Sequence, residues 1–427
     1  MIKQINRQHI SNINWLFFDV LVRMTFNLVI LILISRYLGP EKFGTYSYVL
    51  SIASIASVVA NCGLQNIVVT DIARNETNAD IIVKHAIYIT GATSLICFAL
   101  LIAFLFFVDG SKSDHFEIGI VVGLLIFFRP TEVISYYFEA LIKMKFTVIS
   151  RIISNYTANV IRIILIYIEA ELLFFGIVLL IEGLIFSLAL IHFYFFRTAP
   201  KKEISFRLQT AWKLFKRALP LSLSTIVIIL NMRIDQVMVG NLLNKHELGI
   251  FSAAVRSSEI WFFMIGIFIT TFYPTILKIK ENDIRAESAA WSNLYSVMII
   301  FSIITSYVIC IFSSDIVFIL YGKEYERAGE VISIYVWSGV LIATTSVWQK
   351  WIISKDKFYI DTISHCIAVV SNVLFNLYLI PNYGILGAAY ATLLSGTISS
   401  IAGFMCYRPL TTINYILNIN LLKKITK

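Results

Sequence analysis

The stretch that decides the fold is residues 217–274, RALPLSLSTIVIILNMRIDQVMVGNLLNKHELGIFSAAVRSSEIWFFMIGIFITTFYP. It contains two apolar runs, near 219–243 and 248–273, and each run is long enough to cross about 30 Å of hydrocarbon as a tilted α-helix. The connector between them, Asn-Lys-His-Glu at 244–247, is too short for anything but a tight turn. The stretch therefore predicts an antiparallel hairpin of two membrane-spanning helices.

Charged residues lie deep inside both arms of this hairpin. Counted from its tip, Asp235 and Arg256 share one depth and Arg233 and Glu259 share another, about 15–20 Å into the membrane. A charge at that depth is unfavourable unless it is paired or hydrated. The sequence leaves two interpretations open, namely two interhelical salt bridges or a polar, water-filled path. They are compatible, because Arg233 and Asp235 point about 200° apart around their helix.

The composition is that of a membrane protein with many spans. Hydrophobic residues make up 58% of the 427 positions and charged residues 14%, and the mean hydropathy is +0.80. A soluble core of this size would not be so apolar, which predicts an all-α membrane protein. The five cysteines lie in apolar runs without a C-x-x-C spacing, so no disulfide or zinc framework is expected. The first apolar run is far longer than that of a signal peptide, so no cleavable signal is expected either.

The apolar runs divide the chain into two halves with about six spans each. Lysines and arginines concentrate in alternate connecting segments, which by the positive-inside rule predicts that both termini are cytoplasmic. We expect an N-terminal lobe at 1–196, a basic cytoplasmic linker at 197–217, and a C-terminal lobe with a cytoplasmic tail at 218–427. The expected spans lie near 14–37, 43–68, 85–108, 117–140, 147–168, 172–196, 219–243, 248–273, 290–313, 328–350, 358–380 and 384–407.

Short sequence echoes relate the two halves. F-G-x-Y-S at 43–47 is echoed by L-G-x-F-S at 248–252. An asparagine pair on one helix face, Asn155 with Asn159, is echoed by Asn372 with Asn376. Amides inside a membrane seek partners on neighbouring helices. Two related six-span lobes are typical of a transporter that works by alternating access, with its site near the midplane.

Several motifs carry a family resemblance. They are R-Y-L-G-P at 36–40 with F-G-x-Y at 43–46 and G-L at 63–64, R-x-D with Gly240, L-G-x-F-S-A-A at 248–254, L-Y-G-K-E-Y at 320–325, and Y-G-I-x-G-A-A at 383–389. In this order the set resembles the polysaccharide-transport (Wzx-type) branch of the multidrug/oligosaccharidyl-lipid/polysaccharide (MOP) exporter superfamily, with its MATE-like fold of two lobes.

The resemblance implies a function that composition does not reveal. It implies a flippase that moves undecaprenyl-diphosphate-linked oligosaccharide units, of O-antigen or a similar surface polysaccharide, across a bacterial inner membrane. It implies no enzymatic activity, no bound cofactor and no nucleic-acid partner, with a gradient of H⁺ or Na⁺ as the candidate energy source. A polysaccharide polymerase and a chain-length regulator are candidate partners in lipopolysaccharide biosynthesis.

Arginines inside the spans are the candidate substrate-binding residues, because a guanidinium donates two hydrogen bonds to phosphate oxygens. The candidates are Arg23, Arg129, Arg233 and Arg256. The candidate charge partners or coupling groups are Asp19, Glu132, Glu182, Asp235 and Glu259, and the candidate polar faces are Asn155, Asn159, Asn372 and Asn376. Arg151 and Arg162 lie nearer the span ends, where long side chains reach the interface.

Three of these candidates depend on their local context. Pro130 is expected to interrupt its span, and Glu132 is placed to neutralise Arg129, three residues earlier on the helix. Asp19 and Arg23 are one turn apart and able to pair. Glu182 has no charged neighbour in sequence, so it must face a cavity, meet an arginine from another helix, or be protonated.

Two other function classes remain as alternatives. A MATE-like multidrug antiporter would be expected to show acidic cation sites and fewer buried arginines. A membrane-embedded polysaccharide polymerase would be expected to have a large outer loop, which this chain lacks. The chain contains no G-x-x-x-x-G-K-[ST], H-E-x-x-H or G-x-S-x-G motif, and no histidine spacing suited to a metal.

Overall fold

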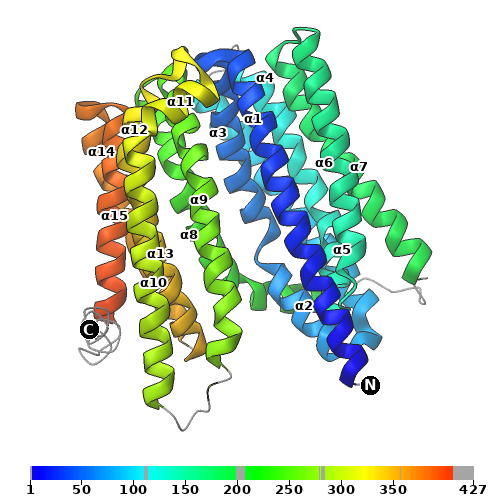
Figure 1. Cartoon of the computed structure of the whole chain (residues 1–427). Helices are drawn as coiled ribbons and strands as arrows, with labels where there is room; N and C mark the ends of the chain where they lie inside the picture. The colour runs from blue at the N-terminus through cyan, green and yellow to red at the C-terminus, as the bar shows by residue number, and fades with distance from the viewer. Residues whose placement is uncertain are drawn as a thin grey trace. The chain divides into compact units, whose positions relative to one another are not determined.

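The computed structural model describes residues 2–109, 114–198, 207–277, 279, 284–355 and 357–406, and it describes side chains only from Phe26 onward. These residues form helices and their connections, with no strand among them. The elements, shown in Figure 1, are α1 (Ile2–Asn61), α2 (Leu64–Arg74), η1 (Glu76–Asn78), α3 (Ala79–Asp109), α4 (Asp114–Gly123), η2 (Leu124–Phe128), α5 (Arg129–Ala140), α6 (Met144–Tyr167), α7 (Leu172–Thr198), α8 (Leu208–Leu242), α9 (Lys245–Leu277), α10 (Ile284–Ile311), α11 (Ser313–Tyr321), η3 (Lys323–Tyr325), α12 (Ala328–Tyr335), α13 (Ser338–Ser354), α14 (Phe358–Tyr383) and α15 (Ile385–Cys406).

The predicted membrane spans agree with the helices. Within the described residues, 11 helical segments are long and apolar enough to cross a membrane. The first of them, Phe26–Arg74, is 49 residues long and takes in the predicted spans at 43–68 and, from Phe26 onward, at 14–37. The other ten match the remaining predicted spans one for one. The all-α membrane fold expected from the sequence is therefore confirmed.

The long helix α1 is interrupted at Gly39–Pro40. Gly39 has φ 70° and ψ 171°, a backbone conformation open essentially to glycine alone. Before this turn, the Tyr37 hydroxyl donates to the Ala170 carbonyl just beyond the end of α6 (2.9 Å). After it, the Asn61 amide donates to the Tyr136 hydroxyl on α5, just before α6 begins (2.8 Å). The chain thus reverses at the predicted Gly-Pro turn, and each arm spans the membrane once.

A second interruption divides the span expected at 117–140. It consists of α4, the 3₁₀ helix η2 and α5, and Pro130 lies in the first turn of α5, as expected from the sequence. At this interruption the Arg129 N–H donates to the Ile126 carbonyl, and two side-chain hydroxyls add further bonds to backbone carbonyls. The Ser94 hydroxyl of α3 donates to the Ile126 carbonyl (3.0 Å), and the Thr131 hydroxyl donates to the Phe128 carbonyl (2.7 Å).

The helices pack into two compact units, Met1–Ile229 (unit 1) and Leu230–Lys427 (unit 2). The boundary falls inside α8, further along the chain than the predicted linker at 197–217. The reason is local, since Ala211, Leu214 and Ala218 are buried in a hydrophobic core with α2, α3, α5 and α7. Residues 199–206 of that linker lie outside the described part of the chain.

A bidentate ion pair also holds the start of α8 to unit 1. The Arg217 Nη1 and Nη2 atoms lie 2.8 and 2.9 Å from the two carboxylate oxygens of Asp71 on α2. The hydrogen bonds from the Arg217 guanidinium to this carboxylate raise the pKa of Arg217. The first part of α8, up to Ala218, therefore packs with unit 1 through both apolar contacts and this ion pair.

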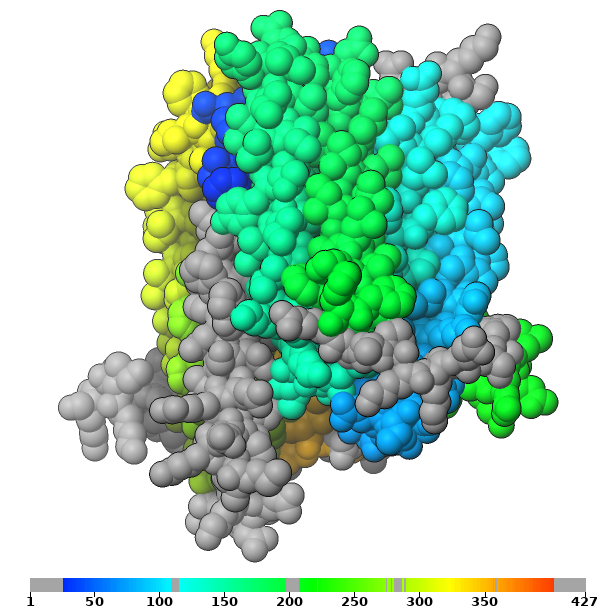
Figure 2. Space-filling model, turned by 90° about the vertical axis from the view of Figure 1, so that its right-hand side faces the viewer, coloured from blue at the N-terminus to red at the C-terminus, as the bar shows by residue number. Residues whose placement is uncertain are grey.

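One face of unit 1 is formed by α6 and α7 (Figure 2). Large apolar side chains are exposed along both helices, among them Val160, Ile164, Leu184 and Leu188. A contiguous apolar surface of this kind is unfavourable in water and marks a protein or membrane interface. Together with the length of the helices, it indicates that this face meets lipid.

Candidate functional site

Two arginines of unit 2 share one carboxylate. Arg233 on α8 places its Nη1 atom 3.0 Å from Oε1 of Glu259 on α9. Arg256, three residues before Glu259 on the same helix, places its Nη1 atom 3.2 Å from Oε2. The exposed fraction of the side chain is 14% for Arg233, 27% for Arg256 and 23% for Glu259. This cluster carries one net positive charge within the membrane-spanning part of unit 2.

The interpretation of two separate salt bridges is wrong for one of its pairs. Arg233 pairs with Glu259 as the matched depths predicted, but Asp235 does not pair with Arg256. Asp235 points around α8 in the other direction, toward α14 and α15. Its carboxylate oxygens accept hydrogen bonds from the Asn376 amide (2.6 Å) and the Thr392 hydroxyl (2.7 Å).

Asp235 is the centre of a second polar cluster, and it is only 4% exposed. The Asn376 amide also donates to the Asn372 Oδ1 atom (2.9 Å), and Asn372 donates to the Ser395 hydroxyl (3.5 Å). Asn376 Oδ1 is buried and has no hydrogen-bond partner in the described part of the chain. No cationic side chain described by the structure forms an ion pair with Asp235. A buried carboxylate without a counter-charge is unfavourable, so this site favours a proton or a bound cation.

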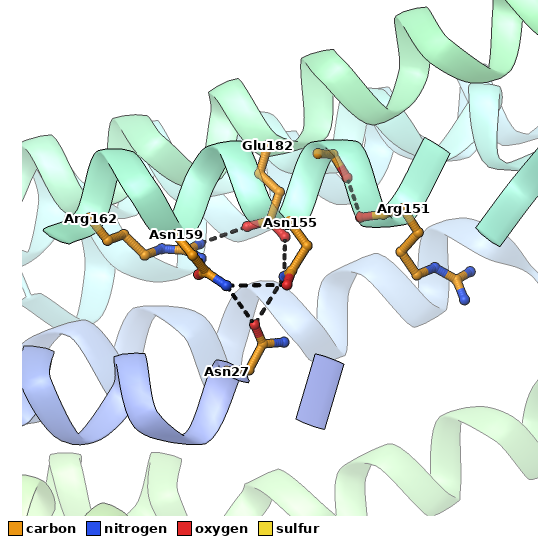
Figure 3. A network of polar contacts seen from close by, with 7 residues as sticks. Asn27, Arg151, Asn155, Asn159, Arg162 and Glu182 are labelled. Atoms are coloured by element: carbon orange, nitrogen blue, oxygen red, sulfur yellow. Dashed lines mark hydrogen bonds and ion pairs between the residues drawn. The ribbon is translucent and has the colours of Figure 1, made fainter. Parts of the chain in front are cut away.

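Unit 1 contains a matching network on α6, shown in Figure 3. The Asn155 amide donates to Oδ1 of Asn27 on α1 and to Oε1 of Glu182 on α7, both at 3.0 Å. The Asn159 amide donates to the same oxygen of Asn27 (3.2 Å) and to Asn155 (3.2 Å). Arg162 donates to Asn159 and pairs with Glu182, each at 2.6 Å. Here the carboxylate has a permanent counter-charge.

The two asparagine pairs therefore have the same role in the two units. In unit 1 the pair on α6 joins α1 through Asn27 and α7 through Glu182. In unit 2 the pair on α14 joins α8 through Asp235 and α15 through Ser395. The sequence echo between 155–159 and 372–376 thus corresponds to one repeated arrangement, which differs in the helix that carries the carboxylate and in the presence of an arginine partner.

The network resolves the open prediction for Glu182 and includes residues that the sequence did not single out. Glu182 meets an arginine from another helix, Arg162, which lies seven residues after Asn155 and hence on the same helix face. That spacing could have predicted that Arg162 joins the asparagine network. The sequence gives no comparable signal for Asn27 or Thr392, because a single polar residue in an apolar run does not identify its partner.

The remaining candidates of unit 1 lie elsewhere. Arg129 pairs with Glu132 at 2.6 Å, as predicted, beside a mostly apolar pocket of about 280 Å³ that also includes Ser54 and Ser57. The Arg151 side chain points away from the asparagine network (Figure 3), and its guanidinium lies 5.8 Å from the Phe186 ring centre. The side chains of Asp19 and Arg23 fall outside the described residues, so their pairing stays a prediction. Among the described residues, no three His, Cys, Asp or Glu side chains are grouped to hold a metal ion.

A family model described as "Polysaccharide biosynthesis protein" matches residues 10–280. The chain belongs to this family. Among its curated relatives, the capsular polysaccharide biosynthesis protein CapF of Staphylococcus aureus is 23% identical over 93% of this chain and 99% of its own length. A putative O-antigen transporter of Shigella flexneri is 22% identical over 89% of this chain and 93% of its own length. The family expected from the sequence motifs is confirmed.

Solved structures confirm the family's fold in this chain. The lipid II flippase MurJ in an inward closed conformation matches with a TM-score of 0.75 at 15% identity, over 96% of this chain and 91% of that one. An inward-facing multidrug MATE transporter of the MOP superfamily matches with a TM-score of 0.69 at 16% identity, over 97% of this chain and 100% of that one. At these identities the similarity establishes the fold alone.

Proposed function

We propose that this protein is a flippase for a polyprenyl-diphosphate-linked oligosaccharide, of the kind from which O-antigen and capsular polysaccharides are built. The observation that carries the proposal is the cluster of Arg233, Arg256 and Glu259. A diphosphate needs cationic donors inside the membrane, and arginine suits this role because its planar fork binds two phosphate oxygens. Membership of the polysaccharide biosynthesis family supports the sugar-bearing lipid as the substrate class.

The charge of the cluster distinguishes this function from the multidrug alternative. An organic cation would be repelled by two arginines that share one glutamate, whereas an anionic lipid would be attracted. The other two arginine pairs described within the spans are matched one to one with carboxylates, at Arg129–Glu132 and Arg162–Glu182. The unit 2 cluster is therefore the best candidate for the diphosphate.

Asp235 is the proposed coupling residue. Its carboxylate is buried among neutral donors, so its charge must be compensated by something that arrives and leaves, either a proton or a monovalent cation. It lies on α8 two residues after Arg233, so one helix carries both the proposed coupling residue and a proposed substrate arginine. We place the protein in a bacterial inner membrane with both termini cytoplasmic, where its product would be used by a polymerase and a chain-length regulator.

A deletion strain tests the proposed function. Deleting the gene should cause undecaprenyl-linked oligosaccharide to accumulate on the inner face of the membrane, as measured by extraction and mass spectrometry with a membrane-impermeant glycan label. The wild-type gene should restore surface polysaccharide, while Arg233→Ala and Arg256→Ala should not. Arg327→Ala is the matched control, because this arginine lies just before the span Ala328–Ser354 and pairs with Glu247 at the very start of the span Lys245–Leu277. Normal surface polysaccharide in both arginine variants would remove the cluster from the mechanism.

A further inference from the structure

Glu259 holds the two arginines in a way that resembles a bound phosphate. Each of its two carboxylate oxygens accepts a hydrogen bond from a different guanidinium, Arg233 at 3.0 Å and Arg256 at 3.2 Å. Only one nitrogen of each guanidinium is used in these bonds, so donors remain on both. The carboxylate thus lies between two cations on two helices, which is where an anionic group of a substrate would bind best.

We propose that Glu259 is an internal stand-in for the substrate phosphate, which occupies the two arginines in the empty carrier and is displaced by the diphosphate when the lipid binds. This inference rests on the proposed function and adds the group that regulates it. Binding is then an exchange of one anion for another rather than the filling of an empty cationic site. The Arg233 bond to Glu259 is also an ion pair between α8 and α9, so the exchange transfers this link from the protein to the substrate.

Two physical consequences follow from such an exchange. Two unpaired arginines at mid-depth would make the empty carrier unfavourable, and Glu259 lowers that penalty so that the carrier returns to its starting state without substrate. The same carboxylate competes with the diphosphate, which lowers the affinity and speeds release on the far side. Removing the negative charge should therefore tighten binding and slow the transport cycle.

The charge-neutral variant Glu259→Gln tests the proposal directly. The purified full-length protein in lipid nanodiscs is titrated with inorganic pyrophosphate, and the dissociation constant is measured by calorimetry. We expect Glu259→Gln to bind pyrophosphate about tenfold more tightly than the wild type. In proteoliposomes, the same variant should flip lipid-linked oligosaccharide several-fold more slowly. Equal or weaker pyrophosphate binding by Glu259→Gln would overturn the proposal, since Glu259 would then merely position the arginines.

A second variant guards against a folding defect in the first. Glu259→Asp keeps the charge but shortens the reach toward the arginines, so its affinity should lie between those of the wild type and Glu259→Gln. An affinity of Glu259→Asp below that of the wild type would also contradict the proposal. Both variants are compared with the wild type by size-exclusion chromatography and melting temperature.

The same titration separates failure of this inference from failure of the proposed function. Arg233→Ala and Arg256→Ala, each made in the Glu259→Gln background, should lose most of the pyrophosphate binding. If the arginine variants lose binding but Glu259→Gln does not gain it, only the role of Glu259 is overturned. If the arginine variants bind as well as their parent, the cluster is not the diphosphate site and the proposed function loses its main support along with this inference.

Discussion

Arg162 and Glu182 form an ion pair with Nη2 2.6 Å from Oε2, and this contact distinguishes the polar network of unit 1 from that of unit 2. In unit 2 the same asparagine arrangement surrounds Asp235, which has no ion-pair partner among the described side chains. One carboxylate is thus neutralised by a residue that cannot leave. For the other we propose compensation by a proton or cation that can leave, and this difference motivates the first two predictions.

Breaking the Arg162–Glu182 pair should destabilise the protein. In Arg162→Gln the Glu182 carboxylate loses its counter-charge, and in Glu182→Gln the Arg162 guanidinium does. Because Arg162 is only 8% exposed and Glu182 25%, we expect each single variant to lose about 2–3 kcal/mol of stability. The measurement is the melting temperature and the yield of monodisperse protein in detergent.

The double variant Arg162→Gln with Glu182→Gln serves as its control. Two neutral amides remove both charges together, so much of the lost stability should return. Single variants that melt at the wild-type temperature would show that the pair has no structural role.

Asp235→Asn should abolish coupling without unfolding the protein. Asparagine is close to aspartate in size and keeps an oxygen that can accept from Asn376 or Thr392, but it binds neither a proton nor a cation in the same way. We expect flipping in proteoliposomes to stop responding to an imposed H⁺ or Na⁺ gradient. Asp315→Asn on α11 is the matched control and should respond like the wild type, whereas an unchanged response in Asp235→Asn would exclude this carboxylate from coupling.

Gly39→Ala should weaken the fold at the turn in α1. At φ 70° and ψ 171° a side chain is strained whatever the surrounding space, and the expected loss is about 1–3 kcal/mol. The comparison is Gly266→Ala inside α9, where an added methyl group meets no atom within 4 Å and should stabilise the helix by about 0.5–1 kcal/mol. Melting temperatures should therefore shift in opposite directions, and an unchanged or higher melting temperature of Gly39→Ala would contradict the strained turn.

Loss of the Arg217–Asp71 pair should have a small effect. The pair is bidentate, yet the Arg217 side chain is 56% exposed, so solvent screens the attraction. Asp71→Asn is expected to lower stability by about 1 kcal/mol or less. A much larger fall in melting temperature would mean that this contact, rather than the burial of Ala211, Leu214 and Ala218, fastens the start of α8.

The sequence was sufficient for the helices and for some of the ion pairs. Apolar run length placed the spans, and the Gly39–Pro40 and Pro130 signals located the interruptions in α1 and in the span at 117–140. Helix periodicity correctly predicted the pair Arg129–Glu132. Equal depth from the tip of the hairpin correctly predicted the pair Arg233–Glu259. Depth failed for Asp235, because depth alone does not say which neighbouring helix a side chain faces. Asp235 faces α14 and α15, and no local pattern encodes how these two helices pack against α8.

The hydroxyl of Ser94 covers a backbone oxygen that the 3₁₀ turn leaves without its usual helical donor. Selection at position 94 should therefore favour a side chain with a hydroxyl donor over an apolar side chain of similar size. Threonine would keep a hydroxyl at this position, whereas alanine or valine would leave the Ile126 carbonyl with its backbone bond from the Arg129 N–H alone. A variant library at codon 94, selected for function, should therefore retain threonine and lose alanine and valine.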